Sequence, residues 1–174
     1  MLSQEQSVLP AAAPLAGPFW VLRQPTPEEV PDLLALFAEE VRRGKMLPRN
    51  AEEISRCLED WRVAVADGAI VGCVSLIFFN SELCELRSLA VAPEQRKRGI
   101  AGGLIGAAID LARGRGMRRV LTLTRSTGLF ERSGFERQLV QNFPEKVWRD
   151  CTPCPLRECC DEVALVYPIE TSVV

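Results

Sequence analysis

A basic, glycine-containing segment, residues 95–102, lies between a strand-like apolar run and a helix-like apolar run. Arg96, Lys97 and Arg98 supply positive charge, and Gly99 gives the backbone freedom to turn. A loop of this kind, placed at a helix N-terminus, presents free N–H groups and positive charge to an anion, most naturally a phosphate chain. The sequence therefore predicts a phosphate-binding loop, and the alternative interpretation is a solvated basic turn.

The elements that must position this loop follow from apolar periodicity and from turn residues. Residues 84–91 predict a strand that ends before Pro93, and residues 100–113 predict a helix that packs on a sheet and stops at Gly114 and Gly116. Elsewhere we expect strands at 19–23, 62–66, 70–79, 120–124, 135–140 and 162–167, with helices at 26–44, 50–61 and 127–133. The proline- and cysteine-rich segment before the last strand is expected to be irregular.

This order of elements mixes antiparallel hairpins with a crossover helix. It predicts an α/β (α+β) fold with a mixed, mostly antiparallel central sheet flanked by helices. The length of 174 residues suits one domain, here residues 18–174, after a disordered N-terminal tail at 1–17.

Composition excludes several classes of function. A formal charge of −2 gives no general attraction to nucleic acid or to an anionic membrane. No apolar run reaches the roughly 20 residues that span a bilayer, and the N-terminus lacks the basic start of a secretory signal. We therefore expect a cytoplasmic protein. The chain contains no histidine, which excludes Ser-His and Cys-His nucleophilic machinery.

The seven cysteines are not spaced like a disulfide framework. Three lie in apolar segments, where buried reduced thiols are expected, and four gather near the C-terminus: Cys151, Cys154, Cys159 and Cys160. The first pair has zinc-like spacing, but the second pair is adjacent and a site without histidine would be all-thiolate. A structural zinc, a redox-sensitive pair and reduced packed thiols all stay open, and no metal ligands are assigned.

The motif Arg96-x-x-Gly99-x-Ala101, at its position between strand and helix, resembles the pyrophosphate-binding loop of the GNAT N-acetyltransferases. Further motifs resemble the short, single-domain N-acetylglutamate synthases of bacterial arginine biosynthesis, over roughly residues 20–168. They are Gly44-Lys-Met-Leu-Pro-Arg49, Val71-Gly-Cys73, Glu85-Leu-Arg-Ser-Leu-Ala-Val91, Leu129-Phe-Glu-Arg-Ser-Gly-Phe135 and Lys146-Val-Trp-Arg-Asp-Cys-x-x-Cys-Pro, followed by Cys160-Asp-Glu162.

The resemblance implies acetyl-CoA as co-substrate and L-glutamate as acceptor of the acetyl group. The strand before the loop would splay from its neighbour, so that backbone groups reach the pantetheine arm and the thioester, while the loop binds the pyrophosphate. Phe130 stands where many GNAT enzymes have a tyrosine that protonates the thiolate, and here we expect it to pack against the cofactor arm. The implied cofactor-binding residues are Leu89, Ala90, Val91, Arg96, Lys97, Arg98, Gly99, Ile100, Ala101, Gly102 and Phe130.

Acetyl transfer also needs a base for the acceptor ammonium. The resemblance points to Glu85, acting directly or through water, and such a base works best when partial burial raises its pKa. The alternative is a strand-edge carboxylate paired with Arg87, and Glu82 is the second candidate base. The thiolate of coenzyme A is expected either to leave unprotonated or to take a proton from Ser126, Thr127 or water.

The acceptor pocket needs cations for two carboxylates. The resemblance gives this role to Lys45, Arg49 and Arg87, and Arg149 could close the pocket from the C-terminal side. Lys146 could do the same, but a surface charge is the favoured interpretation of that residue.

Two alternatives stay open. One is transfer to another small amine or a peptide N-terminus, because residues 125–128 and the pair Phe79-Asn80 depart from the family pattern. The other is a non-catalytic acyl-CoA-binding or redox-sensing module. For the leading hypothesis we expect direct attack in a ternary complex, small-molecule substrates, no nucleic-acid partner, and a possible homodimer.

Overall fold

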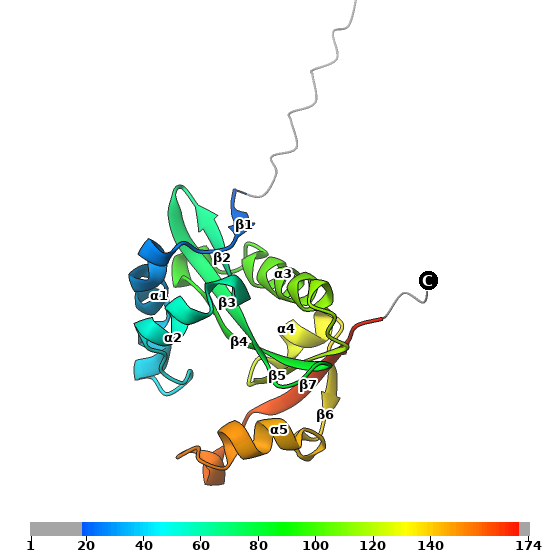
Figure 1. Cartoon of the computed structure of the whole chain (residues 1–174). Helices are drawn as coiled ribbons and strands as arrows, with labels where there is room; N and C mark the ends of the chain where they lie inside the picture. The colour runs from blue at the N-terminus through cyan, green and yellow to red at the C-terminus, as the bar shows by residue number, and fades with distance from the viewer. Residues whose placement is uncertain (1–18, 171–174) are drawn as a thin grey trace, which may run out of the picture.

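A seven-stranded sheet forms the centre of the structure, a computed structural model that describes residues 19–170 (Figure 1). The spatial order of the strands is β1-β2-β3-β4-β5-β7-β6. Their bounds are β1 Val21–Arg23, β2 Trp61–Ala66, β3 Ala69–Phe78, β4 Leu83–Val91, β5 Arg119–Thr124, β6 Glu136–Gln138 and β7 Val163–Pro168. The pair β4–β5 is parallel and the other neighbouring pairs are antiparallel. The predicted mixed, mostly antiparallel sheet is confirmed, whereas the expected tail at 1–17 lies outside the described residues.

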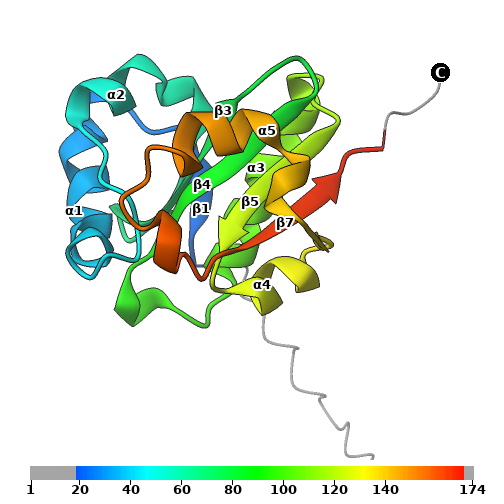
Figure 2. The ribbon, with the colours of Figure 1, turned by 90° about the horizontal axis from the view of Figure 1, so that it is seen from below.

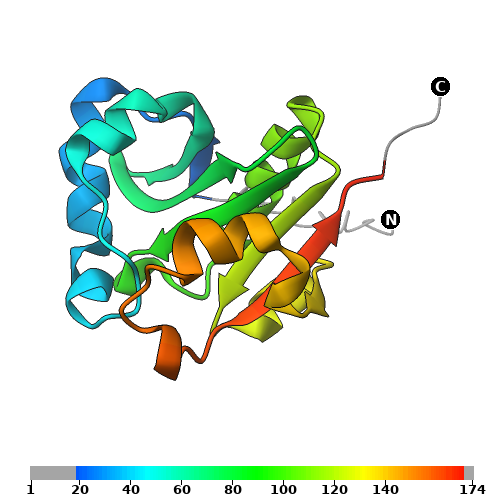
Figure 3. The same cartoon turned by 60° about the horizontal axis from the view of Figure 1, so that its bottom comes forward.

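Helices cover both faces of this sheet (Figures 2 and 3). On one face lie α1 (Val30–Arg42), α2 (Ala51–Arg56) and α5 (Pro144–Lys146), which continues into the π-helical turn η5 (Val147–Cys151). On the other face lie α3 (Ile100–Gly114) and α4 (Thr127–Arg132). Short 3-10 turns occur at η1 Pro27–Glu29, η2 Leu58–Asp60, η3 Pro93–Gln95, η4 Val140–Asn142 and η6 Arg157–Cys159. Within the described range, no helix combines the length and the apolar character needed to cross a bilayer.

The largest part of the core lies between α3 and the sheet. Leu104 and Ile105 of α3 are fully buried there, against inward-facing side chains of β3, β4 and β5. The helix approaches closely because Gly72 of β3 has no side chain: a Cβ there would stand 2.9 Å from Leu104 Cδ1. This close packing fixes the N-terminus of α3, and with it the loop that precedes the helix.

Strand β4 is irregular in its pairing with both neighbouring strands. It pairs with β5 through Leu83–Glu85 opposite Arg119–Leu121, and residues 86–91 and 122–126 then line the two sides of a pocket. Further along, the β3–β4 register shifts by one residue beside Ser88, which has a left-handed φ of 57°. Such a bulge bends a strand and re-aims its side chains. Glu85 therefore stands where the two strands part.

Three sequence-based boundaries were wrong. The second helix ends at Arg56, not at Trp61, because Trp61 begins β2, pairs with Ser75 and stacks on Phe37. The predicted strand at 135–140 shortens to β6. The segment expected to be irregular contains α5 and η5, in which Pro144 occupies the first turn and buried Phe143 precedes it. Proline at the first helical position is favourable because its missing N–H has no helical partner there.

Candidate active site

A pocket of about 660 Å³ opens where β4 and β5 part. Its walls come from β4, β5, the start of α4, the loop after α1, and the C-terminal segment from α5 onward. This volume lies within the range of small-molecule and cofactor sites. The predicted site residues that line it are Lys45, Arg49, Glu85, Arg87, Leu89, Ala90, Val91, Arg96, Ala101, Ser126 and Phe130.

The basic loop turns as an anion-binding loop requires. Lys97 and Gly99 have φ values of 63° and 80°, and Gly99 is the N-cap of α3, so the first N–H groups of this 15-residue helix face out of the loop. The side chains of Lys97 and Arg98 are exposed. That of Arg96 turns back, donating to the Val91 carbonyl at 3.2 Å and to Glu40 at 3.3 Å. Arg96 therefore ties the loop to β4 and α1.

Trp20 braces the same loop from outside. Its indole N–H donates to the backbone carbonyl of Arg98 at 3.3 Å. Its ring covers Gly103 so closely that a Cβ on that glycine would lie 2.4 Å from the ring. The sequence analysis assigned no role to Trp20, because the contact joins residues 78 positions apart.

We expect Trp20→Ala to weaken coenzyme A binding about tenfold, since one hydrogen bond and the packing that orders the loop are both lost. Isothermal titration with coenzyme A measures this effect. Phe19→Ala removes a neighbouring aromatic side chain that is 80% exposed, and it serves as the control. Equal affinities of the two variants would contradict the role of Trp20.

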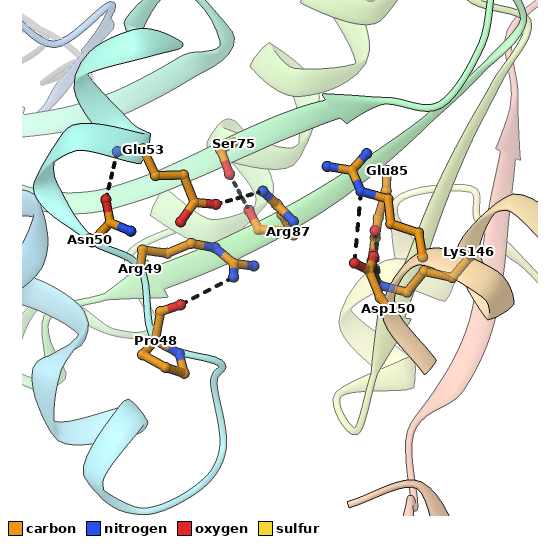
Figure 4. A network of polar contacts seen from close by, with 10 residues as sticks. Pro48, Arg49, Asn50, Glu53, Ser75, Glu85, Arg87, Lys146 and Asp150 are labelled. Carbon is orange, nitrogen blue, oxygen red and sulfur yellow. Dashed lines mark hydrogen bonds and ion pairs between the residues drawn. The ribbon is translucent and has the colours of Figure 1, made fainter. Parts of the chain in front are cut away.

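Glu85 forms a buried ion cluster with two residues of the C-terminal segment (Figure 4). The Lys146 ammonium lies 2.7 Å from Glu85 Oε1 and 3.0 Å from Oε2, and 3.0 Å from Asp150 Oδ2. Only 10% of the Lys146 side chain and 4% of the Glu85 side chain are exposed. Burial lowers the pKa of Lys146, but the two carboxylates outweigh burial and raise it above the usual value. The expectation of a surface charge at Lys146 was wrong, and the partner of Glu85 is Lys146 rather than Arg87.

Arg49 and Arg87 face each other on the opposite side of the site (Figure 4). The Nε atoms of both are buried, and neither has a hydrogen-bond partner within residues 19–170. Arg87 has one ion pair, to Glu53 at 3.3 Å, and Asn50 holds that helix by accepting from the Glu53 N–H. Burial and the nearby Arg49 lower the pKa of Arg87. Two adjacent guanidinium groups with unsatisfied donors form a site for an anion.

Of the other predicted residues, some line the pocket and some lie outside it. Ser126 is exposed at the N-cap of α4, and its N–H donates to Thr124 Oγ1. Phe130 is buried against Phe135, at 5.2 Å between ring centroids. Lys45 is exposed at the pocket wall, whereas Arg149 lies outside the lining, over the Phe79 ring. Glu82, the second candidate base, pairs with Arg118 and does not line the pocket.

Several lining residues were not predicted to belong to the site. They include Thr122, buried on β5, and Asp150, Cys154 and Glu162 of the C-terminal segment. Burial raises the pKa of Glu162, and Arg125 at 3.5 Å opposes this rise. Lys146 and Asp150 stand four residues apart, a spacing that would have placed both on one face had the segment been predicted as helical.

All seven thiols are free, and among the described residues no three Cys, Asp or Glu side chains come together as metal ligands. Burial raises the pKa of Cys73 and of Cys84 to about 12. We therefore expect iodoacetamide at pH 8 to modify exposed Cys57, Cys159 and Cys160 in the native protein while Cys73 and Cys84 stay unmodified. Peptide mass spectrometry checks this, and modification of Cys73 at the rate of Cys57 would contradict it.

The fold and the site together define a class of protein. Residues 28–135, more than half of the chain, match the acetyltransferase (GNAT) family. The chain belongs to that family and is an acetyl-CoA-dependent N-acetyltransferase. This confirms the fold expected from the loop motif and acetyl-CoA as co-substrate.

Two acetyltransferases are similar in sequence to about three quarters of this chain. The chain is 41% identical over 123 residues to an uncharacterized N-acetyltransferase of Chlorobaculum tepidum, covering 71% of this chain and 79% of the relative. It is 30% identical over 134 residues to the amino-acid acetyltransferase of Neisseria meningitidis, covering 76% of this chain but 31% of that longer protein.

Among solved structures, the N-acetylglutamate synthase of Neisseria gonorrhoeae, complexed with coenzyme A and N-acetyl-glutamate, superposes with a TM-score of 0.76 at 25% identity. The match covers 90% of this chain and 36% of that one. A Mycobacterium tuberculosis protein crystallised with coenzyme A shares the fold at a TM-score of 0.73 and 23% identity, covering 86% and 99% of the two chains. The predicted resemblance to amino-acid acetyltransferases is confirmed.

Proposed function

We propose that this protein transfers the acetyl group of acetyl-CoA to the α-amine of L-glutamate, as an N-acetylglutamate synthase in the first step of arginine biosynthesis. Relatives named amino-acid acetyltransferase support an amino-acid acceptor. The proposal includes action in the cytoplasm, a possible homodimer and no nucleic-acid partner.

The observation that carries the proposal is the distribution of charge across the pocket. Arg49 and Arg87 present a positive side with unsatisfied donors. Glu85, Asp150 and Lys146 form a cluster with one net negative charge on the other side. An α-amino acid carries the complementary pair, an anionic carboxylate and a cationic ammonium. Lys45, at the pocket wall, supplies a further cation for a side-chain carboxylate.

In the proposed reaction, Glu85 takes one proton from the acceptor ammonium, directly or through water. The amine lone pair then forms the N–C bond to the thioester carbonyl carbon. When the tetrahedral intermediate collapses, the C–S bond breaks and its electron pair leaves with the sulfur of coenzyme A. The second proton of the amine passes to that thiolate, with Ser126 or water as the carrier. The products are the N-acetylated amino acid, coenzyme A thiol and a protonated Glu85.

Different parts of the site would bind the two ends of acetyl-CoA, the pyrophosphate and the thioester. The α3 N-terminus and the 96–102 loop provide N–H groups and cations for the pyrophosphate. Residues 89–91 line the pocket along β4, so their backbone groups are available to the pantetheine arm. Phe130 and Leu129 form the apolar wall across from them.

The test is an initial-rate panel with acetyl-CoA and L-glutamate, D-glutamate, L-glutamine, L-aspartate and a short peptide. Product is followed by mass spectrometry, because the exposed cysteines of the protein react with thiol reagents. We expect the highest kcat/KM for L-glutamate. Turnover of another amine without L-glutamate would overturn the acceptor assignment, and coenzyme A binding without any turnover would favour a non-catalytic module.

A further inference from the structure

Lys146 is the one lysine that the fold buries, and it lies at the proposed base. Among the three lysines of the chain, Lys45 and Lys97 are exposed, whereas Lys146 is buried between two carboxylates. Burying an ammonium is costly unless it is paired and hydrogen-bonded. Both oxygens of Glu85 and one of Asp150 satisfy it, at distances of 2.7 to 3.0 Å. The arrangement restrains the Glu85 carboxylate where β4 and β5 part.

We propose that Lys146 is a positioning residue for acetyl transfer, whose ammonium balances the charge of the buried Glu85 carboxylate and orients it toward the acceptor amine, while Asp150 holds the ammonium in place. This inference rests on the proposed function only in taking Glu85 as the base for an amine acceptor. It holds for any such amine, so it does not require L-glutamate.

The charged groups around Glu85 show which of them balances its negative charge. On its own strand lie Arg87 and the neutral thiol of Cys84; the C-terminal segment contributes Asp150, Cys151 and Glu162 as well as Lys146. Arg87 is engaged with Glu53 and faces Arg49. Lys146 is the cation in direct contact with Glu85, whereas the carboxylates of Asp150 and Glu162 carry the same charge as Glu85. Without Lys146, a 4%-exposed carboxylate would lie among like charges.

Two substitutions should move the pH profile in opposite directions. Lys146→Met removes the cation in contact with a buried carboxylate, so the acidic limb of kcat/KM should move up by about one to three pH units. Below the shifted limb the rate should fall about tenfold per pH unit, and it should recover at pH values above the limb. Asp150→Asn removes a like charge and leaves the Lys146–Glu85 contact, so the limb should move down.

The controls separate a role in ionisation from a role in folding. Lys146→Arg keeps a cation and should keep the limb within about half a unit of its original position. Arg137→Met removes an exposed cation of β6, 59% accessible, and should change nothing. Thermal melting and coenzyme A titration report whether each variant folds. If Lys146→Met does not fold, the upward shift of the acidic limb is measured in Lys146→Gln and the downward shift in Asp150→Asn.

A folded Lys146→Met or Lys146→Gln variant with an unmoved acidic limb would overturn the proposal, as would an upward shift in Asp150→Asn. The profile is measured with whichever amine the wild type acetylates best. Failure of L-glutamate as acceptor therefore overturns the acceptor assignment alone, whereas an unmoved limb overturns the role of Lys146 alone.

Discussion

Glu85→Gln should lower kcat by about a hundredfold to ten-thousandfold while the affinity for coenzyme A stays close to that of the wild type. Removal of a general base costs this much when proton transfer accompanies the chemical step. Coenzyme A would still bind, because the 96–102 loop and the α3 N-terminus do not involve Glu85. The acidic limb of the pH profile should also disappear, since its ionising group has been removed.

The matched control is Glu162→Gln, because Glu162 is a glutamate that also lines the pocket, from the C-terminal segment. Glu162 pairs with Arg125 at 3.5 Å. Within the part of the chain that the structure describes, the ion pairs of Lys146 are with Glu85 and Asp150 and not with Glu162. We expect less than a tenfold loss in this variant. A larger loss in Glu162→Gln than in Glu85→Gln would move the base to Glu162, whose pKa burial raises. Steady-state kinetics of both variants decide between the two carboxylates.

The parts of the fold that could be predicted from sequence are those set by local signals. The apolar run ended by Pro93 and the apolar helix after the basic loop predicted β4 and α3 within about one residue. The Asp67-Gly68 pair predicted the β2–β3 turn, and both residues have positive φ. These features depend on turn chemistry and on the period of apolar residues, which act over a few positions.

The parts that escaped prediction depend on contacts between distant segments. The pairing of Lys146 with Glu85 joins residues 61 positions apart. This pairing requires the segment after Phe143 to be helical. The many polar and cysteine residues of that segment gave no apolar pattern from which a helix could be predicted. Trp61 likewise fits a helical pattern, but its stacking on Phe37 and its pairing with Ser75 place it in β2. Local propensity was overridden by tertiary packing in both cases.

The arginine pair, Arg49 and Arg87, could be predicted only in part. Residue types and the family resemblance were enough to select Arg49 and Arg87 as candidate acceptor contacts. Their proximity was not predictable, because it depends on the loop after α1 folding back over β4. The structure adds the buried, unpaired Nε atoms of both residues. It also adds the anchor at Glu53, which fixes the direction of the Arg87 guanidinium.

Arg87→Met should raise KM for L-glutamate and lower kcat/KM by about a hundredfold to a thousandfold, with a smaller effect on kcat. A guanidinium that is 19% exposed and pairs with a ligand carboxylate in a pocket contributes this much, because its loss leaves Arg49 alone to pair with a carboxylate that is removed from water. Methionine preserves the length and most of the volume of the side chain. The binding of coenzyme A should not change.

Arg87→Lys, Glu53→Gln and Arg56→Met complete the test. Lysine keeps the charge but loses the fork that grips a carboxylate with two N–H groups, so an intermediate loss of activity is expected. Glu53→Gln releases the anchor of Arg87 and should raise KM only a few-fold. Arg56 lies on the same helix as Glu53 with 73% of its side chain exposed, and Arg56→Met should leave the kinetics unchanged. If Arg87→Met lowers the activity with a carboxylate-free amine as strongly as with L-glutamate, then Arg87 does not bind the acceptor carboxylate, and its contribution is to the structure of β4.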